Sequence, residues 1–340
     1  MNPIKYSLAK AMVKRSVSHS DFNAAAAERN FDVDRAVSDY NNSYYFACLG
    51  ADGTAAILRL AGRGSGAFEL WFSLNLPGRG RLNVPVTLQK TVKSFEKSPL
   101  GIICREPEKS LAISFNGTVK DENGKSAKVK FNAELTSDFP IFHFTNDADP
   151  APMARSMAEE KWTKQWFLTL QGMHQHHYEQ GGDLTGTLSV DGKTRTLKMK
   201  FFRDHSFGPR SWDSLDRHLW LSMCLDDGSF INLSLPEYPF IKIRAGFHAK
   251  DGRYTPVVGS TSFAEIVAGT PPPPSFYFVL YLADGRRLRG SCVRGPEFTW
   301  LMDDVYRVFE WVSFYTVEQV QGRGICEFGY NVRRFDYGLA

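Results

Sequence analysis

Alternating polar and apolar residues dominate this chain, and glycine-containing turns interrupt the alternation at short intervals. Six turns place Asp-Gly or Asn-Gly between apolar or alternating runs, at 52–53, 123–124, 191–192, 227–228, 251–252 and 284–285. These dipeptides tolerate the positive φ angles of tight hairpin turns, so they are the strongest short-range signal for a β-hairpin. Six of them predict an antiparallel, all-β protein.

The runs between the turns predict specific strand pairs and few helices. A separate strand, 68–76, ends at a Pro-Gly turn, and helical patterns are limited to part of 21–40, to 153–162 and to a weak segment at 262–268. The predicted hairpins are 112–119 with 127–134, 184–190 with 194–202, 219–225 with 229–235, 276–282 with 286–293, and 306–315 with 324–330, the last of which closes a barrel.

Two hairpin-rich halves follow one another and suggest a duplicated β architecture. The segment 147–152 contains two prolines, breaks the strand pattern and leads into the predicted helix, which indicates a domain boundary near residue 150. We therefore expect a flexible basic leader at 1–30, a β-sandwich or barrel domain at 31–150, and a β-barrel domain at 151–335.

Composition excludes several classes of protein. Aromatic residues make up 14% of the 340 residues, which favours strands and large apolar cavities. The net charge of +4 is spread without a long basic run, so nucleic acid is not expected as a partner. No apolar stretch approaches the roughly 20 residues of a membrane helix, so no integral membrane segment is predicted.

The cysteines and the N-terminus bear on localisation. Five widely spaced cysteines, without a C-x-x-C pair, indicate reduced thiols in an intracellular protein, not a disulfide framework or a zinc site. Residues 1–20 hold Lys5, Lys10, Lys14 and Arg15 and no acid before Asp21. A basic leader on a cytoplasmic protein is the main expectation, and a mitochondrial transit peptide is the alternative.

The densest group of candidate catalytic residues is 203–212, Arg-Asp-His-Ser-Phe-Gly-Pro-Arg-Ser-Trp. Ionisable groups at the end of an apolar strand are costly to bury unless they are paired or used for chemistry. In an unbroken strand, Arg203 and His205 point inward with the apolar residues and Asp204 points outward; a β-bulge would invert this. The sequence leaves both registers open, and a simple rim ion pair of Arg203 with Asp204 is a further alternative.

Two other segments carry polar side chains that could act with this group. In 174–180, His174, His176 and Tyr178 share one strand face, so they could hold a metal with His205, form an acid–base set, or simply be polar decoration. The pattern does not fit a cupin metal motif, and we predict no metal and no cofactor. In 322–328, alternate glycines allow close backbone approach, and Glu327 is expected to pair with an arginine of the 203–210 segment.

The order of these segments resembles the lipocalin-like superfamily, which includes carotenoid hydratases, tocopherol cyclase and fungal decalin-forming Diels–Alderases. The hydratases carry Tyr-x-Asp-His-Asn-Trp-Gly after an upstream His-x-Trp, and the likeness is confined to about 160–330. It is closer to an uncharacterised branch with Arg-Asp-His-Ser-Trp/Phe-Gly-x-Arg and Gly-x-Gly-x-x-Glu, found also in animal phosphoenolpyruvate synthase-like proteins whose phosphotransfer domains are missing here. The residues that correspond to the hydratase segment are Phe202, Asp204, His205, Ser206, Phe207 and Gly208, with His176 and Tyr178 as the upstream pair.

The resemblance implies two lipocalin-like barrel domains that enclose a terpenoid, polyketide or lipid-like molecule. Acid-assisted hydration, cyclisation or isomerisation would then use Asp204 as the proton donor, with its pKa raised by an apolar wall, and His205 and His176 as its partners. Phe202 and Tyr178 replace a tyrosine and a tryptophan of the hydratases, which displaces a possible proton donor. The expected ligand-contacting residues are Tyr178, Arg203, Trp212, Trp220 and Phe202, and the expected structural residues are Arg210, Gly208 and Glu327.

The rival interpretation is a lipocalin-like binding or interaction module without catalysis. In that case the Arg-Asp-His segment is a structural latch that ties the barrel to a loop. Arg203 or Arg210 would pair with Glu327, and loss of either partner would lower stability.

Overall fold

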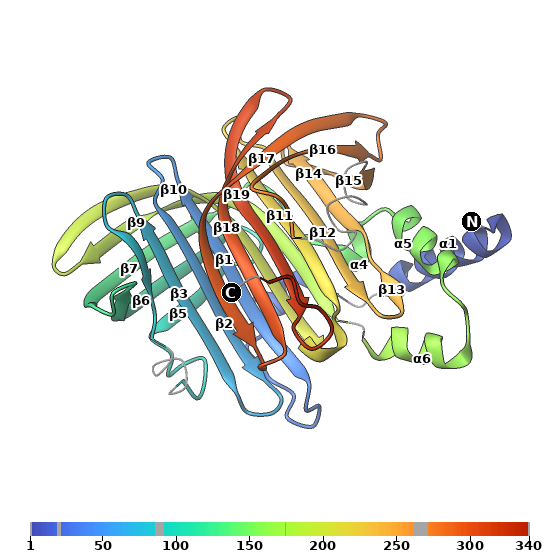
Figure 1. Ribbon diagram of the computed structural model, residues 1–340, viewed down its shortest axis with the longest axis horizontal. Coiled ribbons are helices and arrows are strands. Elements are labelled where there is room, and N and C mark those ends of the chain that lie inside the picture. Colours follow the sequence, from blue (N-terminus) through green and yellow to red (C-terminus); the bar gives the residue numbers. More distant parts are fainter. Residues whose placement is uncertain (1, 19–21, 86–91, 174, 261–270, 339–340) are drawn as a thin grey trace. The chain divides into compact units, whose positions relative to one another are not determined.

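A computed structural model of the chain describes residues 2–18, 22–85, 92–173, 175–260 and 271–338. It contains two compact units, each built around one antiparallel β-barrel (Figure 1). The first barrel unit comprises Phe22–Phe142 and Gln175–Pro209, and the second barrel unit comprises Met1–Asp21, His143–His174 and Arg210–Ala340. The all-β fold predicted from the hairpin turns is confirmed.

Eight strands close the first barrel, because β9 and β10 pair with each other and so join the two ends of the strand path. Two further strands extend the same sheet, β5 (Leu100–Glu106) beside β6 and the short β8 (Phe142–His143) beside β9. In order around the barrel the strands are β10 (Lys193–Pro209), β1 (Tyr40–Gly50), β2 (Ala55–Arg63), β3 (Phe68–Leu76), β4 (Gly80–Asn83), β6 (Ser110–Asp121), β7 (Ser126–Thr136) and β9 (His176–Val190).

The second barrel closes in the same way through the pairing of β11 with β12, and β13 (Ile241–Lys242) adds to β12. Its strands in order are β11 (Arg217–Leu225), β19 (Val320–Asn331), β18 (Tyr306–Val317), β17 (Arg287–Met302), β16 (Ser275–Leu282), β15 (Arg253–Ser260), β14 (Ala245–Lys250) and β12 (Phe230–Tyr238). The five predicted hairpins are all present.

The six turns behave as their sequence predicts, since every glycine in them has a positive φ. At 191–192 and 251–252 the aspartate is left-handed as well, as in a type I′ turn. In the other four turns only the glycine is left-handed. There an aspartate side chain accepts a hydrogen bond from a backbone N–H two residues on, as Asp52 does from Thr54 and Asp227 does from Ser229.

Among the described helices, all except α2 (Ala24–Ala27) belong to the second barrel unit. Those of the second barrel unit are α1 (Pro3–Ser18), α4 (Phe144–Asp147), α5 (Pro150–Glu159), α6 (Lys164–Gly172) and the single 3₁₀ turn η1 (Trp212–Ser214). Helix α5 starts three residues before the predicted 153, because Asp149 caps it and Pro150 fits its first turn. The predicted helix at 262–268 lies outside the described residues.

The organisation differs from the predicted succession of leader, first domain and second domain. Residues 3–18 form helix α1, whose fully buried Ala9 packs with Ala154, Met157 and Trp166. Residues 175–209 return to the first barrel, because the barrel lacks its last two strands until β9 and β10 are added. The segment around 203–209 therefore belongs to the first barrel unit, whereas the prediction placed it in the second domain.

Side chains fill each barrel. In the first barrel, aromatic and aliphatic residues from every strand of the closed path form one cluster, and Phe72 stacks on Phe115 with 3.7 Å between ring centroids. The polar residues of this barrel therefore lie at one of its ends and on the outer faces of its strands. Among the described helices, none is long and apolar enough to cross a membrane.

Candidate functional site

Strand β10 carries the Arg-Asp-His segment in an unbroken register between β1 and β9. Its apolar residues Met199 and Phe201 belong to the barrel core, so Arg203 and His205 point inward with them. Asp204 points to the outer face. Of the two registers left open by the sequence, the one without a bulge is present.

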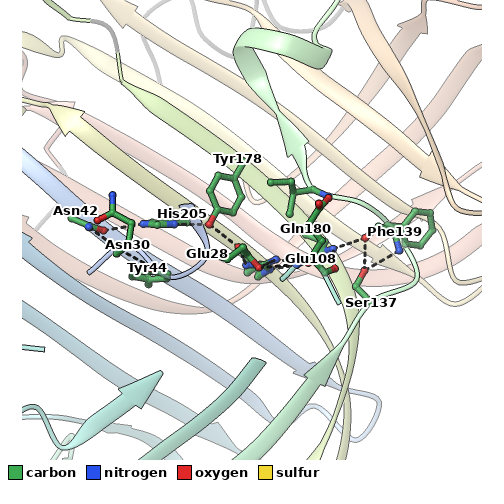
Figure 2. A network of polar contacts seen from close by, with 12 residues as sticks. Glu28, Asn30, Asn42, Tyr44, Glu108, Ser137, Phe139, Tyr178, Gln180 and His205 are labelled. Atoms are coloured by element: carbon green, nitrogen blue, oxygen red, sulfur yellow. Dashed lines mark hydrogen bonds and ion pairs between the residues drawn. The ribbon is translucent and has the colours of Figure 1, made fainter. Parts of the chain in front are cut away.

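The inward residues form a buried polar network (Figure 2). Arg203 donates two hydrogen bonds to the carboxylate of Glu28, at 2.6 and 2.9 Å, and two more to Gln180 Oε1. Glu28 is 1% exposed and Arg203 2%. Burial would raise the pKa of Glu28, but the Arg203 guanidinium and the hydrogen bonds from Arg203, Tyr178 and Glu108 hold that pKa below its ordinary value.

His205 extends this network to Asn42. The Asn42 amide nitrogen donates to the carbonyls of Asn30 and Asp32, so its Oδ1 faces His205 Nε2, 2.9 Å away. We therefore assign the ring proton to Nε2 and leave Nδ1 to accept from the Tyr178 hydroxyl at 2.6 Å. The same hydroxyl lies 2.6 Å from Glu28 Oε1, so one proton is shared between two acceptors. Burial lowers the pKa of His205 to about 3, which keeps the ring neutral.

Glu28 reaches the barrel from the segment that precedes the first strand. Asn23 caps the single turn of α2 by accepting a hydrogen bond from the Ala26 N–H, and Glu28 follows as its C-terminal cap. Figure 2 shows Glu28 between Tyr178 and Gln180. Glu28 is not among the site residues predicted from the sequence. Its one local signal is an isolated acid after four alanines, and its partner Arg203 is 175 residues away.

The outward residues of β9 and β10 form a second group, made of His177, Glu179 and Asp204. Asp204 lies opposite Glu179 in the ladder, and His177 is two residues before Glu179 on the same face. His177 Nε2 contacts the Asp204 carboxylate and lies 3.3 Å from Glu179 Oε1. The side chains of His177 and Asp204 are 26% and 20% exposed, whereas that of Glu179 is fully buried.

Electrostatic interactions hold the imidazole of this outward group as a cation. Burial lowers the pKa of His177, but the Asp204 carboxylate, followed by Glu179, raises it to about 10. The predicted apolar wall beside Asp204 is therefore replaced by an imidazolium. The three groups offer one nitrogen and two carboxylate oxygens within 4.8 Å of one another, a donor set that could also hold a divalent metal.

The other predicted residues lie in several places. His176 points inward, between Phe22 and Phe207, so neither His176 nor His205 shares a face with Asp204. The upstream pair on the face of Asp204 is His177 and Glu179, one position later than the resemblance suggests. Phe202 is fully buried on that same face, and Gly208 has φ +128°, which strains any other residue.

Trp212, Trp220, Arg210 and Glu327 belong to the second barrel unit. The Arg210 guanidinium lies 4.3 Å from the Trp212 ring, and Glu327 hydrogen-bonds His218. Arg210 acts on Glu327 electrostatically, since its guanidinium is among the groups that lower the pKa of that carboxyl, whereas Arg203 binds Glu28 in the first barrel unit. His218 is not among the site residues predicted from the sequence.

The chain thus folds into two closed eight-stranded antiparallel β-barrels. The chain belongs to the family described as "Domain of unknown function (DUF7064)", whose model matches residues 24–332. No sequence among the curated proteins matches the chain.

Solved structures with similar folds share little sequence with it. The crystal structure of CghA is 8% identical with a TM-score of 0.51, covering 88% of this chain and 90% of that one, and CghA with Sch210972 is 9% identical with a TM-score of 0.50, covering 86% and 89%. Kievitone hydratase from Nectria haematococca is 11% identical with a TM-score of 0.45, covering 92% and 94%. At these identities the likeness to CghA shows the fold alone.

Proposed function

We propose that this protein binds an apolar small molecule of terpenoid, polyketide or lipid-like character and catalyses an acid-assisted hydration, cyclisation or isomerisation. The proton donor is the imidazolium of His177. Asp204 and Glu179 hold that charge in place. The observation that supports this most is a partly exposed imidazolium held by two carboxylates on one face of the sheet.

The high pKa of His177 limits which groups its imidazolium can protonate. An acid with a pKa near 10 protonates a carbon that becomes basic during the reaction, such as the α-carbon of an enolate, more readily than an unactivated double bond. After transfer, the neutral imidazole recovers a proton from water or from the carbon that the reaction has made acidic. This favours isomerisation or cyclisation of an oxygenated, otherwise apolar substrate within the proposed class.

The inward residues have a structural role in this proposed mechanism. Arg203, Tyr178 and His205 are occupied by Glu28 and Asn42, so we assign them to holding the 22–39 segment against the barrel. This inward network is also the specific observation behind the second candidate, a binding module without catalysis. In that case the His177 group is only a surface ion pair.

Native mass spectrometry of the purified protein with elemental analysis would find a retained ligand and name its class. Incubation of that ligand in D₂O would then show a product that carries deuterium from the acid. We expect His177→Asn and Asp204→Asn to lose this incorporation by at least tenfold while they remain folded. Asp183→Asn, which alters an exposed β9 aspartate paired with Lys200, is the matched control and should keep it.

Full incorporation by His177→Asn would exclude His177 as the acid and favour the binding module. A stoichiometric metal lost in the same variant would replace the acid assignment with a metal site.

A further inference from the structure

The second barrel has a polar group of its own on the outer face of β11, β18 and β19. Leu219, Leu221 and Met223 belong to the barrel core, so the alternate residues His218, Trp220 and Ser222 face outward. Across the ladder, Trp220 lies opposite Glu327, and Glu327 lies opposite Glu310. These side chains therefore share one face.

Hydrogen bonds link this outer group across three strands. Tyr306 Oη lies 2.6 Å from His218 Nδ1, and His218 Nε2 lies 2.5 Å from Glu327 Oε1. The ring of His218 reaches Tyr306 by passing over Gly329 of the strand between them. A Cβ at Gly329 would lie 2.4 Å from His218 Cε1 and 2.6 Å from Tyr306 Cε1, so only glycine leaves room for the contact.

Glu327 is the member of this outer group that an external molecule can reach. Its side chain is 18% exposed, compared with 10% for His218 and complete burial for Glu310 and Tyr306. Burial would raise the pKa of Glu327, but the hydrogen bonds from His218 and Glu310 keep that pKa below its ordinary value. Glu327 thus offers a fixed carboxylate acceptor, which binds a hydroxyl donor more strongly than a neutral acceptor does.

The surroundings combine aromatic surface with buried polar atoms. Trp212 stacks on Tyr306 with 5.2 Å between ring centroids. Ser222 and Asn232 lie opposite each other in the ladder of β11 and β12, on the same outward face, and both are fully buried. Ser222 Oγ, Asn232 Oδ1 and Trp212 Nε1 have no hydrogen-bond partner among the described residues. Buried polar atoms of this kind are costly unless a bound group satisfies them.

We propose that this outer face of the second barrel is a ligand site for a flat apolar molecule that carries a hydroxyl group. The hydroxyl donates to the carboxylate of Glu327. The rings of Trp212 and Trp220 contact the apolar part, and Ser222 and Asn232 bind a second polar group. His218, Tyr306 and Glu310 are positioning residues that fix the Glu327 carboxylate. This site does not depend on the proposed role of His177.

Two probes test the site, 2-naphthol and its methyl ether 2-methoxynaphthalene, which cannot donate a hydrogen bond. Isothermal titration calorimetry of the full chain should show that 2-naphthol binds about tenfold more tightly or better, because only its hydroxyl can donate to a charged acceptor. Glu327→Gln should remove this preference. Asp251→Asn, an exposed change in a turn of the same barrel, should retain it.

Trp220→Ala separates the apolar contact from the polar one. It should weaken both probes by a similar factor and leave their ratio unchanged, so it also tests the site if Glu327→Gln fails to fold. Equal binding of the two probes by the unaltered protein, or an unchanged ratio in folded Glu327→Gln, overturns the proposal. His177→Asn should bind both probes normally, which separates a failure here from a failure of the proposed function.

Discussion

Arg203 and Asp204 are neighbours in the chain, yet their side chains contact different partners on opposite faces of β10. Arg203 binds the buried carboxylate of Glu28 inside the barrel end, and Asp204 contacts His177 on the outer face. The alternation of a strand thus divides one short segment between two tasks. We assign stability to its inward residues and chemistry to its outward residue.

Glu28→Gln should destabilise the first barrel by about 3–5 kcal/mol, because it leaves the buried guanidinium of Arg203 without its charge partner. Urea unfolding at pH 7 measures this loss. The pKa of Glu28 is lower in the folded protein than in the unfolded chain. The stability that its charge contributes is therefore fully present above the pKa of the unfolded chain, and it is lost as the pH falls through the pKa of the folded protein. The difference between the two proteins should therefore shrink in acid.

The matched control is Glu106→Gln, which removes an exposed carboxylate paired with Lys109 in the same barrel. Exposed pairs of this kind contribute about 0–1 kcal/mol. Equal effects of the two substitutions would show that the Glu28–Arg203 pair does not hold the barrel end.

Much of the fold could be predicted because its determinants are local. An Asp-Gly or Asn-Gly turn fixes which strands meet, and four of the five predicted hairpins contain one. The fifth turns at Glu318 and Gln319, which both have a positive φ. The closure of each barrel joins strands far apart in the sequence, such as β1 with β10. No local sequence pattern indicates that residues 175–209 complete the first barrel.

The site could be predicted only in part, for the same reason. Alternation placed Arg203 and His205 inward once the register was known, but the sequence could not exclude a bulge. It also could not choose between His176 and His177 as the partner of Asp204, because a shift of one residue changes the face. Glu28 was missed because the pairing with Arg203 is set by tertiary structure.

The stabilising contribution of the charged His177 to the free energy of unfolding should decrease as the pH rises from about 6.5 towards 10. Asp204 and Glu179 raise the pKa of His177 to about 10 in the folded protein, whereas a histidine of the unfolded chain titrates near 6.5. Between these two values the folded protein binds one more proton than the unfolded chain, so the free energy of unfolding falls as the pH rises. His177→Asn should flatten this slope in urea unfolding between pH 6 and pH 10. An identical slope in both proteins would mean that the ring is not held as a cation.

His205 should remain neutral throughout the range from pH 5 to pH 9, because burial lowers its pKa to about 3. Nitrogen NMR of labelled histidine should show one ring in the tautomer protonated at Nε2, as its contact with Asn42 Oδ1 requires. Asn42→Ala should broaden or shift that signal, whereas the signal of His177 should stay unchanged. A His205 signal that titrates near pH 6.5 would contradict the assigned network.

Gly329→Ala should destabilise the second barrel by about 1–3 kcal/mol, because the added methyl group meets the rings of His218 and Tyr306. Gly172→Ala is the control, since a Cβ there meets nothing within 4 Å. The decisive measurement is a double-mutant cycle with His218→Ala. Removing the imidazole removes one of the two clashes, so Gly329→Ala should cost less in that background. Equal costs in both backgrounds would show that Gly329 is not required for the passage of His218 over β19.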